Sequence, residues 1–190
     1  MTEDNAARQP YDPDHAVIQA MAAGNAAALD ELYARYGPGI LNFLVARLNN
    51  RQLAEEVLQD VMLAAWKSAP IFRGESKVLT WLLTIARNRA INTQRKNRPT
   101  LVEFSDEIKL QSADTGPLEA IVKTDRYEAV REALKLLPDG QREVLVLVFF
   151  QQLTGVEVAE VLGISVGTVK SRLFRAKELL RRALAGEEIL

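Results

Sequence analysis

Cysteine is absent from the 190-residue sequence, and histidine occurs only once, as His15. The absence of cysteine excludes disulfides, thiolate metal sites and thiol catalysis. A single histidine near the N-terminus argues against imidazole-based zinc sites and catalytic triads. No glycine loop suited to cradling a phosphate is present either. We therefore assign no catalytic residue, expect no metal or other cofactor, and do not expect an enzyme.

Long apolar runs are also missing. No stretch of about 18 apolar residues occurs, and the first ten residues, MTEDNAARQP, are polar and acidic. A transmembrane span and a secretory signal peptide are therefore not expected, and the sequence predicts a cytoplasmic protein. The length suits one or two small domains, each with a modest core.

Helical periodicity is the main pattern that is present, and no strand pattern of comparable strength occurs. Gly24, and Gly37 with Pro38, are expected to separate the first three helices. Ser76, Thr154 and Ser165 are expected N-caps of later helices. The sequence therefore predicts an all-α fold with two small helical domains joined by a flexible linker. The expected parts are a disordered tail (1–14), a first domain (15–97), an acidic linker (98–124) and a second domain (125–190).

Positive charge is concentrated in two places, although the formal net charge of the chain is only -1. Residues 73–98 carry a net charge of +6 and residues 164–190 carry +3, and the intervening residues 99–163 carry -6. A polyanion would be attracted to the two basic blocks and repelled between them. The alternative is that each block is an ordinary solvated helix face.

The segment TGVEVAEVLGISVGTVKSRLFRA, residues 154–176, predicts two short helices joined by a tight turn at Gly163. Val158, Leu162 and Val169 can close a core between the helices, which is the pattern of a helix-turn-helix. The second helix of such a unit enters the DNA major groove with its N-terminal half. The residues expected to project from that half are Gly167, Thr168, Lys170, Ser171, Phe174 and Arg175, with Arg172 nearer the phosphates. An ordinary helical hairpin with a solvated surface is the alternative.

The motifs FRGES, TWL, IARN and GISVGTVKSRLFRAK occur in this order along the chain. Residues 29–96 resemble the second conserved region of bacterial extracytoplasmic-function (ECF) RNA polymerase sigma factors, and residues 137–180 resemble the fourth. The resemblance implies a protein that binds core RNA polymerase, through the β′ and β subunits, and directs promoter-specific initiation. It further implies that the helix-turn-helix reads the −35 element as duplex DNA.

The same resemblance implies that the first domain binds the melted non-template strand of the −10 element. The loop FRGES would hold an extruded base, and the helix after it would neutralise phosphates and stack bases. The residues concerned are Phe72, Arg73, Gly74, Glu75, Ser76, Lys77, Trp81, Thr84, Arg87, Asn88 and Arg95. Core packing is the alternative role for Trp81, and an ordinary surface position is the alternative for Asn88.

A third surface follows from the resemblance. The helix AEEVLQDVMLAAW, residues 54–66, matches the family surface that binds the β′ coiled coil, with contacts expected from Glu56, Gln59, Asp60 and Leu63. A solvated amphipathic helix is the alternative. The resemblance also implies a monomer in the holoenzyme and an anti-sigma partner that could retain the protein at the inner membrane without membrane insertion of its own. The residues alone also allow a dimeric helix-turn-helix regulator that acts without replacing sigma.

Overall fold

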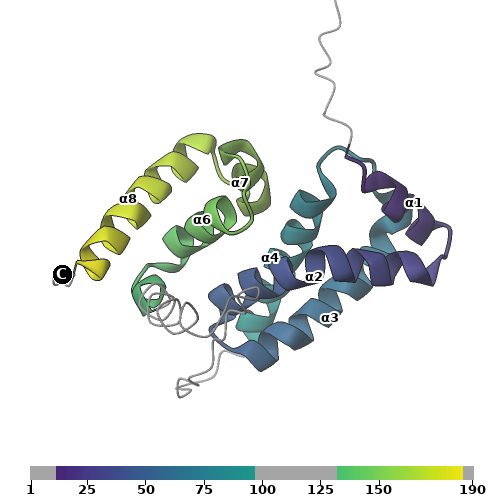
Figure 1. Cartoon of the computed structure of the whole chain (residues 1–190), viewed down its shortest axis with the longest axis horizontal. Coiled ribbons are helices and arrows are strands. Elements are labelled where there is room, and N and C mark those ends of the chain that lie inside the picture. Colours follow the sequence, from purple (N-terminus) through teal and green to yellow (C-terminus); the bar gives the residue numbers. More distant parts are fainter. Residues whose placement is uncertain (1–11, 97–131, 186–190) are drawn as a thin grey trace, which may run out of the picture.

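A computed structural model describes residues 12–96 and 132–185, and all regular structure in those residues is helical (Figure 1). The all-α prediction is confirmed. The N-terminal half contains α1 (His15–Ala22), α2 (Ala26–Leu48), α3 (Arg51–Ser68), a 3-10 turn η1 (Ala69–Ile71) and α4 (Val78–Lys96). The C-terminal half contains α6 (Asp139–Phe149), α7 (Gly155–Leu162) and α8 (Val166–Leu184). The expected linker, 98–124, lies outside the described residues.

Helix α2 is continuous through Pro38, so the break expected at Gly37 and Pro38 is wrong. A proline inside a helix lacks an N–H donor and crowds the preceding turn, which normally ends or kinks the helix. Here the helix buries Leu32 before the proline and Ile40 after it, while Pro38 itself faces outward. Burial of apolar side chains on both sides therefore outweighs the local cost of the proline.

Two asparagines make the tight turn between α2 and α3. Asn49 ends α2 in the left-handed conformation, with φ 52°. Asn50 then caps α3, because its side-chain oxygen accepts a hydrogen bond from the N–H of Leu53 at 2.9 Å. Asparagine suits both positions, since its short polar side chain tolerates positive φ and satisfies free N–H groups at a helix start. The turn brings α3 back along α2 (Figure 1).

The two halves pack against each other. Helix α7 packs on α4 and α6 packs on α2, and one apolar cluster includes buried residues from all four helices. Phe43 and Leu82 belong to it from the N-terminal half, and Leu147 and Val158 from the C-terminal half. The helical units expected from the sequence are thus present, and in this structure they share a core.

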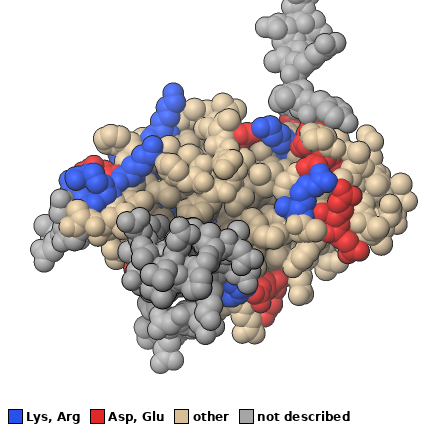
Figure 2. Space-filling view, in the orientation of Figure 1, with Lys and Arg blue, Asp and Glu red and all other residues tan. Residues whose placement is uncertain are grey.

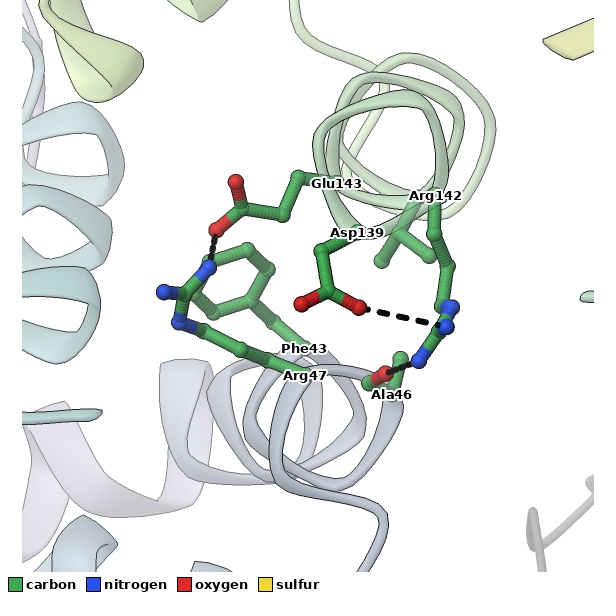
Figure 3. Close-up of a pocket in the computed structure, with 7 residues that line it drawn as sticks. Phe43, Ala46, Arg47, Asp139, Arg142 and Glu143 are labelled. Carbon is green, nitrogen blue, oxygen red and sulfur yellow. Dashed lines mark hydrogen bonds and ion pairs between the residues drawn. The ribbon is translucent and has the colours of Figure 1, made fainter. Parts of the chain in front are cut away.

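Polar contacts fix the register of α6 on α2 (Figure 3). Arg47 of α2 forms an ion pair with Glu143 of α6, at a point where both side chains are largely buried. Beside this pair, Arg142 donates a hydrogen bond to the carbonyl oxygen of Ala46 at 3.2 Å and forms an ion pair with Asp139. Paired charges at a buried contact specify one arrangement, because any other leaves an uncompensated charge in the interior.

Candidate nucleic-acid interface

The helix-turn-helix predicted from the sequence is present. Thr154 caps α7 in a reciprocal capping box with Glu157, and Ser165 caps α8 by accepting a hydrogen bond from the N–H of Thr168 at 3.1 Å. Gly163 ends α7 at φ 60°, a left-handed conformation that favours glycine. The predicted caps Thr154 and Ser165 and the turn at Gly163 are therefore confirmed.

Helix α8 has a buried side and a free side. Val169 and Ala176 are buried against the rest of the C-terminal half, whereas Phe174 is 74% exposed. The other exposed candidates on this side are Gly167, Lys170, Ser171 and Arg175. Figure 2 shows Lys and Arg side chains projecting along α8. We call this free side, formed by Gly167, Lys170, Ser171, Phe174 and Arg175, the α8 face. It is cationic, carries one aromatic ring and begins at the capped N-terminus of the helix.

Two residues of the same helix lie differently. Thr168 is half-buried, and its hydroxyl lies 2.9 Å from the hydroxyl of Ser165 in the cap. Arg172 is also half-buried, because its guanidinium packs against the start of α6: a Cβ built on Gly140 would lie 2.9 Å from Arg172 Nη1. The structure thus places Arg172 at the contact between α8 and α6, away from the outward face where Lys170 and Arg175 lie.

The FRGES loop (residues 72–76) and α4 form the second candidate surface. Arg73 and Glu75 are exposed at the loop tip, and Gly74 has φ 71°. An open groove is lined by loop residues together with Trp81 of α4 and Glu160 of α7. Further along α4, Asn88 and Arg95 are exposed and Thr84 is half-buried; the hydroxyl of Thr84 donates to the carbonyl oxygen of Thr80 at 2.9 Å.

Trp81 packs on the core, as its alternative role predicts, and also lines the open groove. Its ring is half-buried against the apolar core and lies 4.6 Å, centroid to centroid, from the ring of Phe72. The ring of His15 contacts the ring of Phe72 edge-on, with 5.3 Å between the two ring centroids. Trp81 therefore supports the loop through its contact with Phe72, and its side chain is also part of the groove wall.

Helix α4 does not start where the sequence indicates. It begins at Val78, and the carbonyl of Lys77, instead of Ser76, accepts the first helical hydrogen bond, from the N–H of Trp81. The N–H of Val78 donates to Asp12 Oδ2 at 2.7 Å. An acid 66 positions earlier in the chain thus takes the place expected of Ser76. Asp12 and Asp14 were expected in a disordered tail, and the structure differs: both make defined contacts.

Acidic side chains of the C-terminal half contact two basic candidates of the α4 surface. Lys77 Nζ lies 2.8 Å from Glu157 Oε1, and Arg87 Nε lies 3.8 Å from Glu143 Oε1. Hydrogen bonding and attraction to Glu157 raise the pKa of Lys77. Burial alone would raise the pKa of Glu157, but hydrogen bonds from Lys77 and Thr154 outweigh burial and hold that pKa below its usual range. Two basic candidates of this surface are therefore paired with carboxylates of the C-terminal half.

The chain matches two family descriptions: "Sigma-70 region 2" over residues 32–100 and "Sigma-70, region 4" over residues 127–180. It is 34% identical to the RNA polymerase sigma factor YlaC of Bacillus subtilis over 157 residues, which cover 82% of this chain and 91% of that protein. It is 35% identical to the ECF RNA polymerase sigma factor RpoE of Cereibacter sphaeroides over 162 residues, 84% of this chain and 87% of that one. The chain belongs to the ECF sigma factors.

A solved structure of similar fold is CnrH in complex with the cytosolic domain of CnrY. It superposes with a TM-score of 0.69 at 26% identity, covering 93% of this chain and all of that one. The family identifies a promoter-recognising transcription initiation factor and disfavours the dimeric regulator. Sigma factors are not themselves enzymes. Among the helices in residues 12–96 and 132–185, none has the length and apolarity needed to cross a bilayer.

The sigma factor presents its third candidate surface on α3. Glu56, Gln59, Asp60 and Leu63 all lie exposed, at spacings that place them on one face of the helix. Leu63 is one of the few large apolar side chains exposed in the N-terminal half. Exposed acids around an apolar side chain suit contact with a basic or amphipathic partner helix.

Sequence reasoning missed the residues that connect the parts of the sigma factor. Asp12 and His15 reach the start of α4 and the FRGES loop, and Glu143 and Glu157 reach α4 from the other half. Of these, only Glu157 carried a local sequence signal, the spacing of a capping box after Thr154. The others are paired with residues far away along the chain, which no local pattern encodes.

Proposed function

We propose that the α8 face binds the −35 element in the major groove and that the FRGES loop with α4 binds the melted −10 strand. The observation that carries this proposal is the α8 face itself. A capped helix buries Val169 and Ala176 and leaves Lys170, Phe174 and Arg175 free at the point where a helix-turn-helix meets DNA.

Within the −35 contact, each residue has a distinct part. Arg175 can bond guanine with two parallel N–H donors, whereas Lys170 acts on guanine or phosphate as a point charge. Ser171 and Thr168 offer hydroxyl groups, and the exposed ring of Phe174 can contact a thymine methyl. Arg172 lies against α6, so its main role is to hold α8 in position. Its positive charge also attracts the DNA phosphates at longer range.

Within the −10 contact, the groove beside the loop would take the extruded base. Trp81 and Phe72 supply aromatic surface, and Ser76 and Glu75 supply polar groups that can read a base edge. Gly74, at φ 71° and packed against His15, allows the turn of the loop backbone that presents these groups. Lys77, Arg87 and Arg95 attract the phosphates, and Asn88 and Thr84 offer further hydrogen bonds. Arg73, exposed at the loop tip, adds a further positive charge.

The −10 contact requires the two halves to move apart. Lys77 and Arg87 are occupied by Glu157 and Glu143 in this structure, and Glu160 of α7 lines the loop groove. The units expected from the sequence, 15–97 and 125–190, therefore separate on the promoter. Each contact alone is weak, and the connection between them raises the effective concentration of the second.

The remaining partners follow from the family and its relatives. The α3 face (Glu56, Gln59, Asp60, Leu63) binds the β′ coiled coil of core polymerase, and the C-terminal half contacts the β subunit. CnrH is bound by the cytosolic domain of CnrY. We propose that this sigma factor is also bound by a protein partner, an anti-sigma factor, which acts on the chain in the cytoplasm. In the holoenzyme the sigma factor is a monomer.

Run-off transcription with core polymerase on genomic promoter fragments tests the proposal. The sigma factor is expected to initiate from a subset of fragments, and Lys170→Ala and Arg175→Ala are each expected to weaken the −35 preference by about tenfold. Arg181→Ala is the matched control, since it removes one positive charge from the same helix at a residue paired with Glu178. An unchanged −35 preference in the first two variants would refute the assignment of the α8 face.

A further inference from the structure

The start of the described chain forms a compact bracket that touches the FRGES loop, α2 and α4. We define the N-terminal bracket as Asp12, Asp14 and His15. The bracket lies before the residues that match Sigma-70 region 2, which begin at residue 32. A tail expected to be disordered would make no such contacts, so the observed contacts call for a physical role.

Asp12 connects the bracket to α4. Its Oδ2 accepts the hydrogen bond from Val78 N–H at 2.7 Å, and its Oδ1 accepts one from the N–H of Asp14 at 3.0 Å. The first N–H groups of a helix have no partner within the helix, and a carboxylate there also interacts favourably with the helix dipole. Asp12 thus fixes where α4 begins, immediately after Lys77.

His15 connects the bracket to the loop. A Cβ built on Gly74 would lie 2.3 Å from His15 Cε1, so the imidazole lies directly against the loop backbone. The same ring meets Phe72 edge-on, and Phe72 in turn packs on Trp81. One histidine therefore contacts the loop at two places, and its contact at position 74 requires the absence of a side chain.

Asp14 anchors the bracket to the rest of the N-terminal half. It is buried, accepts a hydrogen bond from the hydroxyl of Tyr36 and forms an ion pair with Arg35, both residues of α2. The bracket is thus held on a long packed helix, and through Asp12 and His15 it holds a short loop. Arg73 and Glu75, exposed at the loop tip, form an ion pair with each other at 3.7 Å.

We propose that Asp12 and His15 are positioning residues for the loop that captures the −10 base. Asp12 sets the start of α4, and His15 supports the backbone at Gly74 and the ring of Phe72, so that the groove beside Trp81 is formed before DNA arrives. Preorganisation of this kind removes the ordering cost from the binding step. This inference rests on the proposed −10 role of the loop, and its test separates the two.

The first measurement needs no DNA. Amide hydrogen exchange of Val78 in the full chain is expected to accelerate about fivefold in Asp12→Ala, the scale of a lost N-cap. Asp12→Asn keeps a side-chain oxygen acceptor and is expected to retain most of the protection. Asp30→Ala removes an exposed acid from α2 and serves as the charge-matched control. Unchanged exchange at Val78 in Asp12→Ala would overturn the role of Asp12.

The second measurement uses promoter opening by the holoenzyme on a promoter found by run-off transcription. Gly74→Ala and His15→Ala are each expected to lower the rate of opening by about fivefold or more, while −35 duplex binding stays unchanged. Gly74→Ala is harmful in two ways, by the clash of its Cβ with His15 and by the cost of alanine at φ 71°. The double variant His15→Ala/Gly74→Ala removes only the clash, so it is expected to open promoters faster than Gly74→Ala alone and more slowly than His15→Ala. His15→Phe keeps a ring and is expected to retain most activity.

Each result has one meaning. Gly74→Ala can be compared in the parent chain and in His15→Ala. If it lowers the rate of promoter opening by the same factor in both, His15 does not position the loop and the inference is wrong. His15→Ala is also expected to change the fluorescence of Trp81, measured in a Trp66→Phe background, because His15 contacts Phe72 and Phe72 packs on Trp81. If this change and the faster Val78 exchange are both seen while promoter opening does not change, the loop is positioned by the bracket but does not act on the −10 strand. That outcome overturns the proposed −10 assignment and leaves the positioning contacts intact.

Discussion

Glu143 is the acid whose removal is expected to separate the two halves of the sigma factor. Its side chain is 8% exposed, forms an ion pair with Arg47, which is 12% exposed, and lies near Arg87. Removing one partner of a buried ion pair typically costs about 3–5 kcal/mol, because the other charge is left in the interior. Arg47 also donates to Gln94 Oε1 at 3.3 Å, so part of its hydrogen bonding survives. We therefore expect about 3 kcal/mol for Glu143→Ala.

That free energy acts on the contact between the halves. Since about 1.4 kcal/mol corresponds to a factor of ten, the equilibrium between closed and open forms is expected to shift roughly a hundredfold toward the open form. Arg87 would lose its carboxylate partner, and Lys77 would leave Glu157 as α7 moves away. Binding of a single-stranded non-template oligonucleotide is therefore expected to strengthen.

Energy transfer between two dyes measures the separation directly. The chain has no cysteine, so Ala34→Cys and Ala185→Cys introduce the only two thiols for labelling, both at exposed positions of opposite halves. Glu143→Ala is expected to lower the transfer efficiency with helix content unchanged. Asp30→Ala is the matched control, because it removes an exposed acid at the opposite end of α2 from Arg47. Replacing both partners, in Arg47→Met/Glu143→Leu, is expected to restore the closed form. Unchanged transfer in Glu143→Ala would refute the reasoning.

Three further predictions follow from other contacts. Thr154→Ala removes the capping box of α7 and is expected to cost about 1 kcal/mol of stability, seen as a lower Tm; an unchanged Tm would contradict the role of the cap. Leu63→Asp is expected to weaken association with core polymerase by about tenfold and to leave binding of −35 duplex unaltered, and a loss of both would point to unfolding instead. The contact between Lys77 and Glu157 is expected to be constant around neutral pH, because the pKa of Lys77 is raised and that of Glu157 is lowered from their ordinary values. It should weaken as the pH falls through the lowered pKa of Glu157. A dye separation that changes near pH 7 in the parent chain, but not in Glu157→Gln, would speak against it.

Local features of the fold could be predicted from the sequence. The caps at Thr154 and Ser165 and the turn at Gly163 depend on neighbouring backbone groups, so a short window contains the whole cause. The exposed and buried sides of α8 follow from helical spacing in the same way. The break expected at Pro38 was wrong because the deciding factor, burial of Leu32 and Ile40 in one helix, is a tertiary effect.

The parts of the site that could not be predicted depend on contacts between distant residues. Ser76 had the local pattern of a cap, but Asp12 reaches the start of α4 once α1 has packed on α2 and η1. Arg172 shares the outward charge pattern of its neighbours, yet its guanidinium fits against Gly140 in the space between α6 and α8. From the sequence alone, Glu143 cannot be distinguished from an ordinary surface acid. Its ion pair with Arg47 forms only because α6 packs on α2.

The apolar cluster that extends through both halves has a thermodynamic consequence for the free sigma factor. Small proteins with a continuous core unfold in a single cooperative step, whereas independent domains melt separately. Heating in a calorimeter should therefore give one heat-absorption peak whose van't Hoff enthalpy equals the calorimetric enthalpy. A ligand that binds only the separated form would divide this peak in two, so the number of melting transitions would itself report whether polymerase, DNA or a protein inhibitor has parted the two halves.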